Sequence, residues 1–218
     1  MTVQKSAQAS PSRSAATRKR TRIQKEKEEL ILEAALDVFS RHGFRGSTID
    51  QIAVQAGLSK PNVLYYFRTK EAIHRRLIDR LLDNWLEPLR RINEAGDPLS
   101  EIQSYIRRKL ELARDFPRES RLFANEILQG APHIQEELHD LRDLVEDKSS
   151  IINKWIKDGK IAKCDPKHLF FSIWATTQHY ADFDAQIRVV LGPSGEGDGR
   201  FEDAARFLDQ LYVDGLRK

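Results

Sequence analysis

The stretch from Ile49 to Phe67, IDQIAVQAGLSKPNVLYYF, constrains the fold more than any other part of the chain. Gly57 separates two short segments with helical apolar spacing, and glycine readily adopts the left-handed conformation that ends a helix. Ser59 can cap the second segment, and Pro61 falls in its first turn, where no backbone donor is lost. The sequence therefore predicts a helix-turn-helix, with a small helical hairpin of other function as the alternative. Polar and aromatic residues left facing outward on the second helix are Lys60, Asn62, Tyr65 and Tyr66.

Charge is divided unevenly along the chain. Residues 1–75 hold 14 Lys and Arg against 7 Asp and Glu, whereas residues 76–218 hold 22 against 26. The basic part therefore contains the predicted helix-turn-helix. Such an asymmetry is typical of a protein that contacts a polyanion such as DNA at one end. The alternative is a basic, solvated face without a partner.

The composition restricts the class of protein. Charged residues make up 32% of the 218 residues and hydrophobic residues 40%, which is typical of a globular chain. Cys164 is the single cysteine, so no disulfide can form within the chain, and we expect a loop thiol in a reducing compartment. No apolar run is long enough to span a bilayer, and no signal peptide is visible. We expect a cytoplasmic protein without a cofactor.

Helical spacing dominates the rest of the chain, and no segment has a strand pattern. Residues 1–22 are predicted to form a disordered basic arm, which either lies along DNA phosphates or only aids solubility. Residues 23–70 are predicted to form a helix-turn-helix DNA-binding domain, and residues 71–218 a ligand-binding and dimerisation domain. The expected fold is all-α, with an N-terminal three-helix domain followed by a larger helical bundle. After the predicted DNA-binding domain, helices are predicted over residues 70–89, 99–114, 119–128, 132–157, 166–191 and 201–216.

The last two predicted helices carry more apolar surface than one solvent-facing helix needs. Residues 166–191 are apolar on nearly every side, and residues 201–216 carry a continuous apolar stripe. The pattern favours a two-fold, four-helix interface to which each subunit contributes the same pair. The alternative is an internal core within one monomer.

Residues 43–72, GFRGSTIDQIAVQAGLSKPNVLYYFRTKEA, resemble the DNA-binding region of TetR-family transcriptional regulators. The shared elements are Gly-Phe before a capped helix, Ile-Ala within it, Gly57, and a recognition helix closing on aromatic residues and Lys70. Within that family, DNWLEPL and IWATTQHYADF are similar to regulators of pyrimidine utilisation. The resemblance implies a repressor that binds double-stranded operator DNA as a homodimer and releases it on binding a small effector, expected to be uracil or thymine.

The resemblance assigns DNA contacts to eight residues. Asparagine can pair with adenine, leucine can touch a thymine methyl group, and lysine suits phosphate or guanine acceptors. A two-fold dimer further predicts a near-palindromic operator. The residues expected in the major groove are Ser59, Lys60, Asn62, Leu64 and Tyr65, and those expected to hold phosphates are Thr48, Tyr66 and Lys70.

The candidate effector site combines polar and aromatic residues on otherwise apolar helix faces. An indole can stack on a flat imide ring such as uracil, and an amide can pair with its edge. A buried charge costs several kcal/mol unless it is paired or bound. For the two charged stripe residues, a snorkelling lysine and a partly exposed glutamate are the alternatives. The site residues are Trp85, Lys109, Glu126, Trp174, Thr177, Gln178 and Asp182; the four on residues 166–191 share one helix face, and Trp85 is either a pocket wall or plain core.

Two other function classes compete with this interpretation. His179 precedes Asp182, and His133 precedes His139, but no third ligand or nucleophile occurs at a useful spacing. We therefore expect no enzymatic activity, no catalytic residue and no metal site. A TetR-like protein that responds to another effector, or that binds DNA without any effector, is the remaining alternative, and the latter would have a dry apolar interior.

Overall fold

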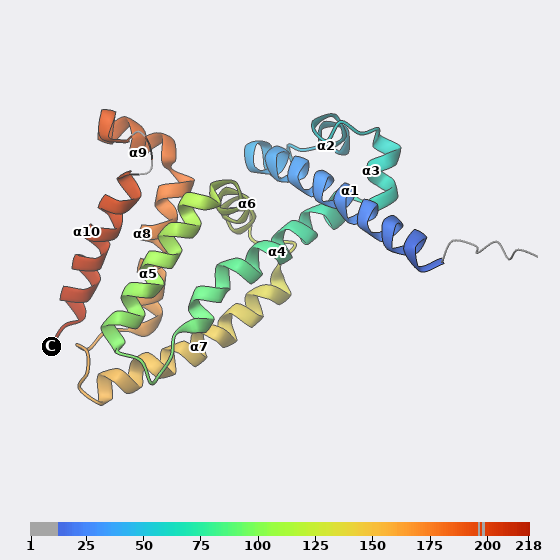
Figure 1. Ribbon diagram of the computed structural model, residues 1–218. Coiled ribbons are helices and arrows are strands. Elements are labelled where there is room, and N and C mark those ends of the chain that lie inside the picture. Colours follow the sequence, from blue (N-terminus) through green and yellow to red (C-terminus); the bar gives the residue numbers. More distant parts are fainter. Residues whose placement is uncertain (1–12, 196, 198) are drawn as a thin grey trace, which may run out of the picture.

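The computed structural model describes residues 13–195, 197 and 199–218, and every regular element among these residues is a helix. The predicted all-α fold is thereby confirmed. α4 joins a small group of helices at one end of the molecule to a larger bundle at the other (Figure 1). No helix in the described part of the chain has the length and apolar character that a membrane crossing requires. The elements are α1 Arg13–His42, α2 Ile49–Gln55, α3 Lys60–Tyr66, α4 Lys70–Arg91, α5 Pro98–Asp115, α6 Pro117–Leu128, α7 Gln135–Lys157, α8 Pro166–Asp182, α9 Asp184–Leu191, the 3-10 turn η1 Gly192–Gly195 and α10 Gly199–Leu216.

Local capping forms the head, α1 to α3, as the sequence predicts. Thr48 Oγ1 accepts the Gln51 N–H at 3.2 Å, and Gln51 Oε1 accepts the Thr48 N–H at 2.8 Å, which is a complete capping box. Ser59 caps α3, and Gly57 between the two helices has a φ of 62°. Each contact spans only a few residues, so the helix-turn-helix is encoded locally.

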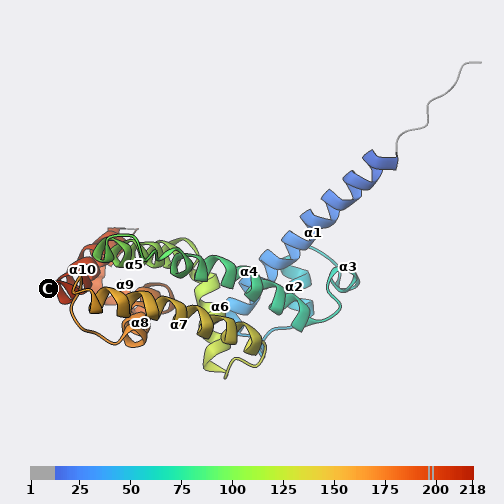
Figure 2. The same cartoon turned by 90° about the horizontal axis from the view of Figure 1, so that it is seen from below.

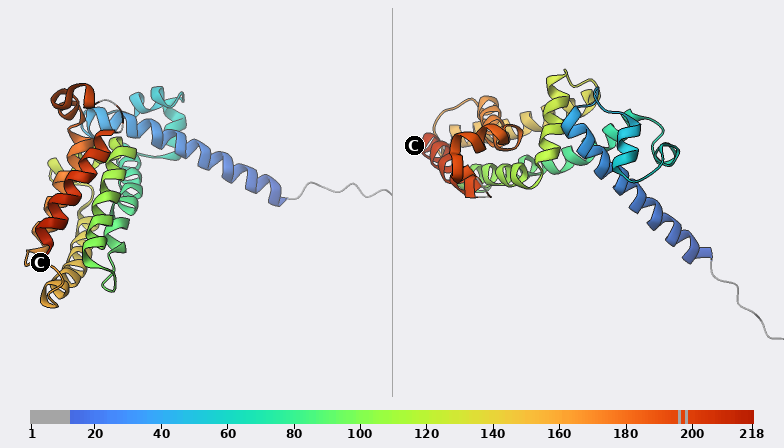
Figure 3. Two further views of the ribbon diagram at one scale, coloured as in Figure 1. Left: turned by 60° about the vertical axis from the view of Figure 1, so that its left-hand side comes forward. Right: turned by 90° about the horizontal axis from the view of Figure 1, so that it is seen from above.

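The start of α1 differs from the predicted disordered arm. Residues 13–22 are helical, and the first half of α1 extends beyond the other helices of the head (Figures 2 and 3). The sequence of this segment has no apolar stripe, but alanine, arginine and lysine are strong helix formers and can continue an existing helix. Residues 1–12, the remainder of the predicted arm, lie outside the described residues.

Two hydrophobic clusters organise the interior. The first fills the head and continues along α4 to α6, so the head and the ligand domain share apolar packing. The second surrounds Trp155 and Phe170 in the larger bundle. In that bundle α5 packs against both α8 and α10, while α7 runs alongside α4 (Figure 1). Burial of these apolar side chains is the main force that holds the two groups together.

Two predicted helices have different boundaries in the structure. The predicted helix 166–191 is broken at Phe183 into α8 and α9, and Asp184 at the start of α9 pairs with Arg200 of α10 at 2.7 Å. The predicted helix 132–157 begins three residues later, at Gln135. The cause of the later start is a turn in which Ala131 has a φ of 55° and the His133 N–H is donated to Glu126 rather than to a helix.

Candidate DNA interface and effector site

The outward face of α3 is available for contact. Lys60, Asn62 and Tyr65 are exposed, and Tyr65 retains 68% of its accessible surface. Val63, on the opposite side, is completely buried and anchors the helix in the head. Lys60 Nζ lies 2.8 Å from the Asp50 carboxylate, both on the surface. An exposed pair of this kind contributes about 0–1 kcal/mol, so it is easily exchanged for a phosphate.

The other predicted DNA residues fall into two groups. Thr48 and Ser59 are exposed, but their hydroxyl groups serve as helix caps. Leu64 and Tyr66 are half-buried, and Tyr66 packs on the apolar cluster of the head while its ring meets that of Tyr65 edge-on at 5.1 Å. The predicted DNA-contacting residues of the head therefore differ in how far their side chains are exposed and free to turn toward a ligand.

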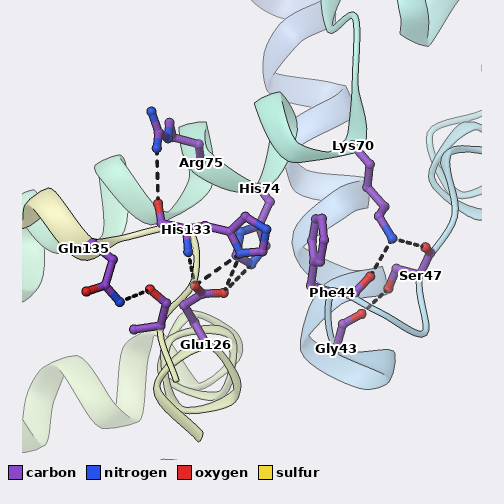
Figure 4. A network of polar contacts seen from close by, with 10 residues as sticks. Gly43, Phe44, Ser47, Lys70, His74, Arg75, Glu126, His133 and Gln135 are labelled. Atoms are coloured by element: carbon purple, nitrogen blue, oxygen red, sulfur yellow. Dashed lines mark hydrogen bonds and ion pairs between the residues drawn. The ribbon is translucent and has the colours of Figure 1, made fainter. Parts of the chain in front are cut away.

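Lys70 has a structural role as well as the predicted phosphate contact. Its ammonium group donates to the carbonyl oxygens of Phe44 and Ser47, both at 2.8 Å, and lies 4.2 Å from the centre of the Phe44 ring. Figure 4 shows Lys70 reaching from α4 to the turn between α1 and α2. Two of its three donors are thus used inside the head, and it ties that turn to α4.

A buried lysine marks the predicted effector site. Lys109 of α5 is 3% exposed, and its Nζ lies 4.8 Å from the centre of the Trp85 ring on α4. Burial lowers the pKa of Lys109 to about 7, a shift that the charge of Asp182 on α8 opposes. Burial also raises the pKa of Asp182, although Ser120 Oγ donates to this carboxyl group at 2.6 Å. Trp85 and Asp182 therefore both lie near Lys109.

Lys109 and Asp182 lie where α5 packs against α8, a contact that we call the seam. The other predicted α8 residues differ in their hydrogen bonds. Trp174 Nε1 donates to the hydroxyl of Tyr105 on α5 at 2.6 Å. Thr177 is fully buried, and its hydroxyl donates to the Ile173 carbonyl of its own helix at 2.7 Å. Gln178 is half-buried, and its amide has no hydrogen-bond partner among the described residues. Gln178 lies one helical turn from Trp174 and one turn from Asp182, on the same face of α8. An amide without a hydrogen-bond partner in the described part of the chain therefore lies between these two residues.

Sequence reasoning missed two residues of this seam. Tyr105 precedes Lys109 by four residues and shares its helix face, a spacing that could have identified it. Ser120 contacts Asp182 across 62 residues of sequence, and no local pattern signals that contact. A cavity of about 170 Å³ between α1 and α4 is also lined by Trp85, which connects the seam to the junction between the head and the bundle.

Glu126 does not join this seam. It is buried near the end of α6, where its carboxylate accepts the His133 N–H at 2.8 Å and lies 3.7 Å from His74 Nε2 (Figure 4). Burial lowers the pKa of His74 to about 4, and the nearby Glu126 charge opposes this shift. The two charged residues singled out from their apolar stripes therefore belong to two separate polar clusters.

Comparisons with known proteins identify the family of this chain. Residues 31–77 match the family model of bacterial regulatory proteins, tetR family, and residues 78–218 match that of the YcdC-like protein, C-terminal region. The chain is 46% identical over 202 residues to the HTH-type transcriptional regulator RutR of Escherichia coli, which covers 92% of this chain and 95% of that protein. These matches confirm the resemblance found in the sequence.

Solved structures share the fold at much lower identity. AibR in complex with isovaleryl coenzyme A and operator DNA is 18% identical, with a TM-score of 0.66 over 85% of this chain and 97% of that chain. The ketosteroid transcriptional regulator of Mycobacterium tuberculosis is 19% identical, with a TM-score of 0.70 over 88% and 95% of the two chains. Such likeness shows a common architecture and nothing about the ligand of this chain.

Proposed function

The chain belongs to the TetR family of ligand-responsive transcriptional regulators, and on that premise we propose that it represses transcription by binding a near-palindromic operator as a homodimer. Uracil or thymine, bound at the seam between α5 and α8, releases the DNA. The site of action is the cytoplasm. The α3 face with Lys60, Asn62 and Tyr65 enters the major groove, and its exposure supports this role.

The observation that supports the effector proposal best is the uncommitted Gln178 amide. A uracil ring presents both carbonyl acceptors and N–H donors at its edge. The Gln178 amide can supply one donor and one acceptor, Lys109 can donate to a carbonyl, and the indole of Trp174 offers a flat surface for the ring. A polar group that an effector covers gives a site selectivity, because an analogue that lacks the matching edge leaves the group unsatisfied.

Replacement of Gln178 with alanine is expected to weaken binding of uracil and thymine about tenfold or more, because one lost buried hydrogen bond corresponds to roughly 1–3 kcal/mol. Calorimetry on the full-length protein measures the change. Gln186→Ala is the matched control, since Gln186 is exposed on α9. Equal binding heats for the wild type and Gln178→Ala would contradict the proposed site. A thermal-shift screen of other metabolites then distinguishes a different effector from a regulator that has none.

Release of DNA requires the effector to favour one arrangement of the two heads. α4 carries Trp85 at the seam and Lys70 in the head, so it connects the two sites physically. An effector that pushes on Trp85 changes the position of α4, and with it the spacing of the heads in a dimer. The effector must bind the DNA-incompetent arrangement more tightly by a few kcal/mol to release the operator.

The dimer proposal is supported by apolar side chains that remain exposed in one chain. On the predicted interface helices, solvent reaches several large residues that a monomer gains nothing by exposing. A stable dimer buries such residues against their copies across a two-fold axis. The exposed residues are Phe171 on α8, Phe183, Val189, Val190 and Leu191 at α9, and Phe207 and Leu211 on α10.

Phe207→Arg is expected to convert the dimer to a monomer, because it places a charge in the apolar interface without disturbing the interior of one chain. Sedimentation velocity measures the change in mass. Leu128→Arg serves as a control, since Leu128 is exposed at the end of α6, away from the proposed interface. A Phe207→Arg protein that remains dimeric would place the interface elsewhere.

A further inference from the structure

Three side chains with metal-binding groups meet at the junction of the head and the ligand domain (Figure 4). His74 comes from the first turns of α4, Glu126 from the end of α6, and His133 from the turn before α7. One nitrogen of each imidazole and one carboxylate oxygen all lie within 4.8 Å of one another. No local spacing in the sequence indicates such a site, because His74 lies far along the chain from the other two residues.

The distances are close to those of a coordination sphere. Glu126 Oε2 lies 3.7 Å from His74 Nε2 and 3.2 Å from His133 Nδ1. Zinc bonds of about 2.0–2.1 Å in tetrahedral geometry place neighbouring ligand atoms about 3.4 Å apart. Two edges of the site therefore already match, and the edge between the imidazoles closes by small side-chain rotations.

This cluster buries a carboxylate and an imidazole with few partners. The Glu126 side chain is 1% exposed, and its ion-pairing partners among the described residues are only the two histidines. His74 is 2% exposed at its side chain, and its Nδ1 is buried without a hydrogen-bond partner. Buried carboxylates and imidazole nitrogens are normally paired. A divalent cation at this point supplies positive charge to the carboxylate and accepts the lone pairs of His74 Nε2 and His133 Nδ1, the nitrogens that face Glu126. His74 Nδ1, on the other side of the ring, then carries the imidazole proton.

Neighbouring groups hold the ligands in place. The His133 N–H donates to Glu126 Oε1 at 2.8 Å, which fixes the carboxylate. His133 Nδ1 lies 3.2 Å from both carboxylate oxygens, and Oε2 also faces His74. The Phe44 ring lies 4.9 Å from the His74 ring and 4.4 Å from the His133 ring, centre to centre. His133 retains 23% side-chain exposure, so the cluster is dry on one side and open to solvent at His133. The opening provides an entry path and space for a water ligand.

We propose that His74, Glu126 and His133 bind one divalent transition-metal ion of the zinc type, with water completing the coordination. Two imidazoles and one carboxylate form a donor set that zinc commonly takes. The ion fastens the α1–α2 turn, through Phe44, to the turn before α7. Because Lys70 ties the same turn to α4, the site lies where the orientation of the head is set. The metal thereby adds a second input, besides the effector, to the DNA-binding head.

The test uses full-length protein without an affinity tag, stripped of metal with a chelator. Zinc titration by calorimetry is expected to show one ion per chain, and cobalt(II) is expected to give visible absorption bands of a tetrahedral nitrogen and oxygen site. Absence of a thiolate charge-transfer band excludes Cys164 as the ligand. No zinc binding, or a cobalt spectrum with that band, would overturn the proposal.

His133→Leu replaces the imidazole with an apolar side chain of similar size and is expected to lower the zinc affinity at least tenfold and to abolish the cobalt bands. Glu126→Gln keeps the acceptor for the His133 N–H and is expected to weaken binding similarly. His139→Leu is the control, because His139 is exposed on α7, outside the cluster. Circular dichroism establishes that each variant is folded. Unchanged binding in both folded cluster variants would show that the metal binds elsewhere.

Discussion

Lys109→Met is expected to raise the free energy of unfolding at neutral pH by about 1 kcal/mol or more, because the cost of burying this charge exceeds its attraction to Asp182. At the same time it is expected to abolish binding of the pyrimidine effector. The reason is that Lys109 is 3% exposed and its ammonium group faces the ring of Trp85 instead of water. We propose that the protein retains this costly charge because the effector uses it.

Because the pKa of Lys109 is lower in the folded chain than in the unfolded chain, the stability of the wild-type protein depends on pH. Burial lowers the pKa of Lys109 from 10.5 to about 7 in the folded protein. Between these two values the unfolded chain binds more protons than the folded chain, so stability contributed by this group rises with pH from about 7 to 10.5. Below about pH 7 both states are protonated, and the full cost of burying the charge is present. Lys109→Met removes this rise.

Urea unfolding at several pH values measures the effect, and calorimetry with uracil measures the loss of binding. Lys157→Met is the matched control, because Lys157 is exposed near the end of α7 and its replacement is expected to change neither quantity. A Lys109→Met protein that is less stable than the wild type at neutral pH would show that the ammonium group is compensated in the folded state. Undiminished uracil binding would remove Lys109 from the effector site.

Substitutions on the outer face of α3 are expected to separate operator binding from stability. Tyr65→Ala is expected to weaken binding tenfold or more, because the ring is 68% exposed and free to reach a base or sugar. Lys60→Ala is expected to reduce the slope of the logarithm of affinity against that of salt concentration by about 1, as for the loss of one phosphate contact. Both variants are expected to have a free energy of unfolding within about 0.5 kcal/mol of the wild-type value, as is usual for substitutions at surface positions.

A gel-shift series at several salt concentrations measures these effects, using a duplex that the wild-type protein selects from random-sequence DNA. Lys157→Ala tests whether any exposed lysine has the same influence. Unchanged affinity and slope in both α3 variants would show that this helix does not enter the groove. A variant that loses its folded structure would show a lower unfolding midpoint. Weaker DNA binding through a lost contact can therefore be distinguished from weaker binding through unfolding.

Residues in short-range contact with their partners could be assigned from the sequence. Thr48 and Ser59 cap their helices through bonds that span three residues, and the turn at Gly57 needs only its own backbone freedom. The break at Phe183 and the helical start at Arg13 were not predicted. In those segments the apolar pattern did not reveal the boundary, since one is apolar across the break and the other has no apolar stripe.

The head of this protein, its all-helical class and several unusual polar residues of the bundle can be identified from the residue pattern alone. Which of those polar residues meet depends on how the helices pack. Lys109 on α5 lies near Trp85 on α4 and near Asp182 on α8. Glu126 instead meets His74 and His133 at the junction with the head. The physical reason is that helix caps depend on neighbours along the chain, while buried charges depend on partners that only the packing of distant helices brings within reach.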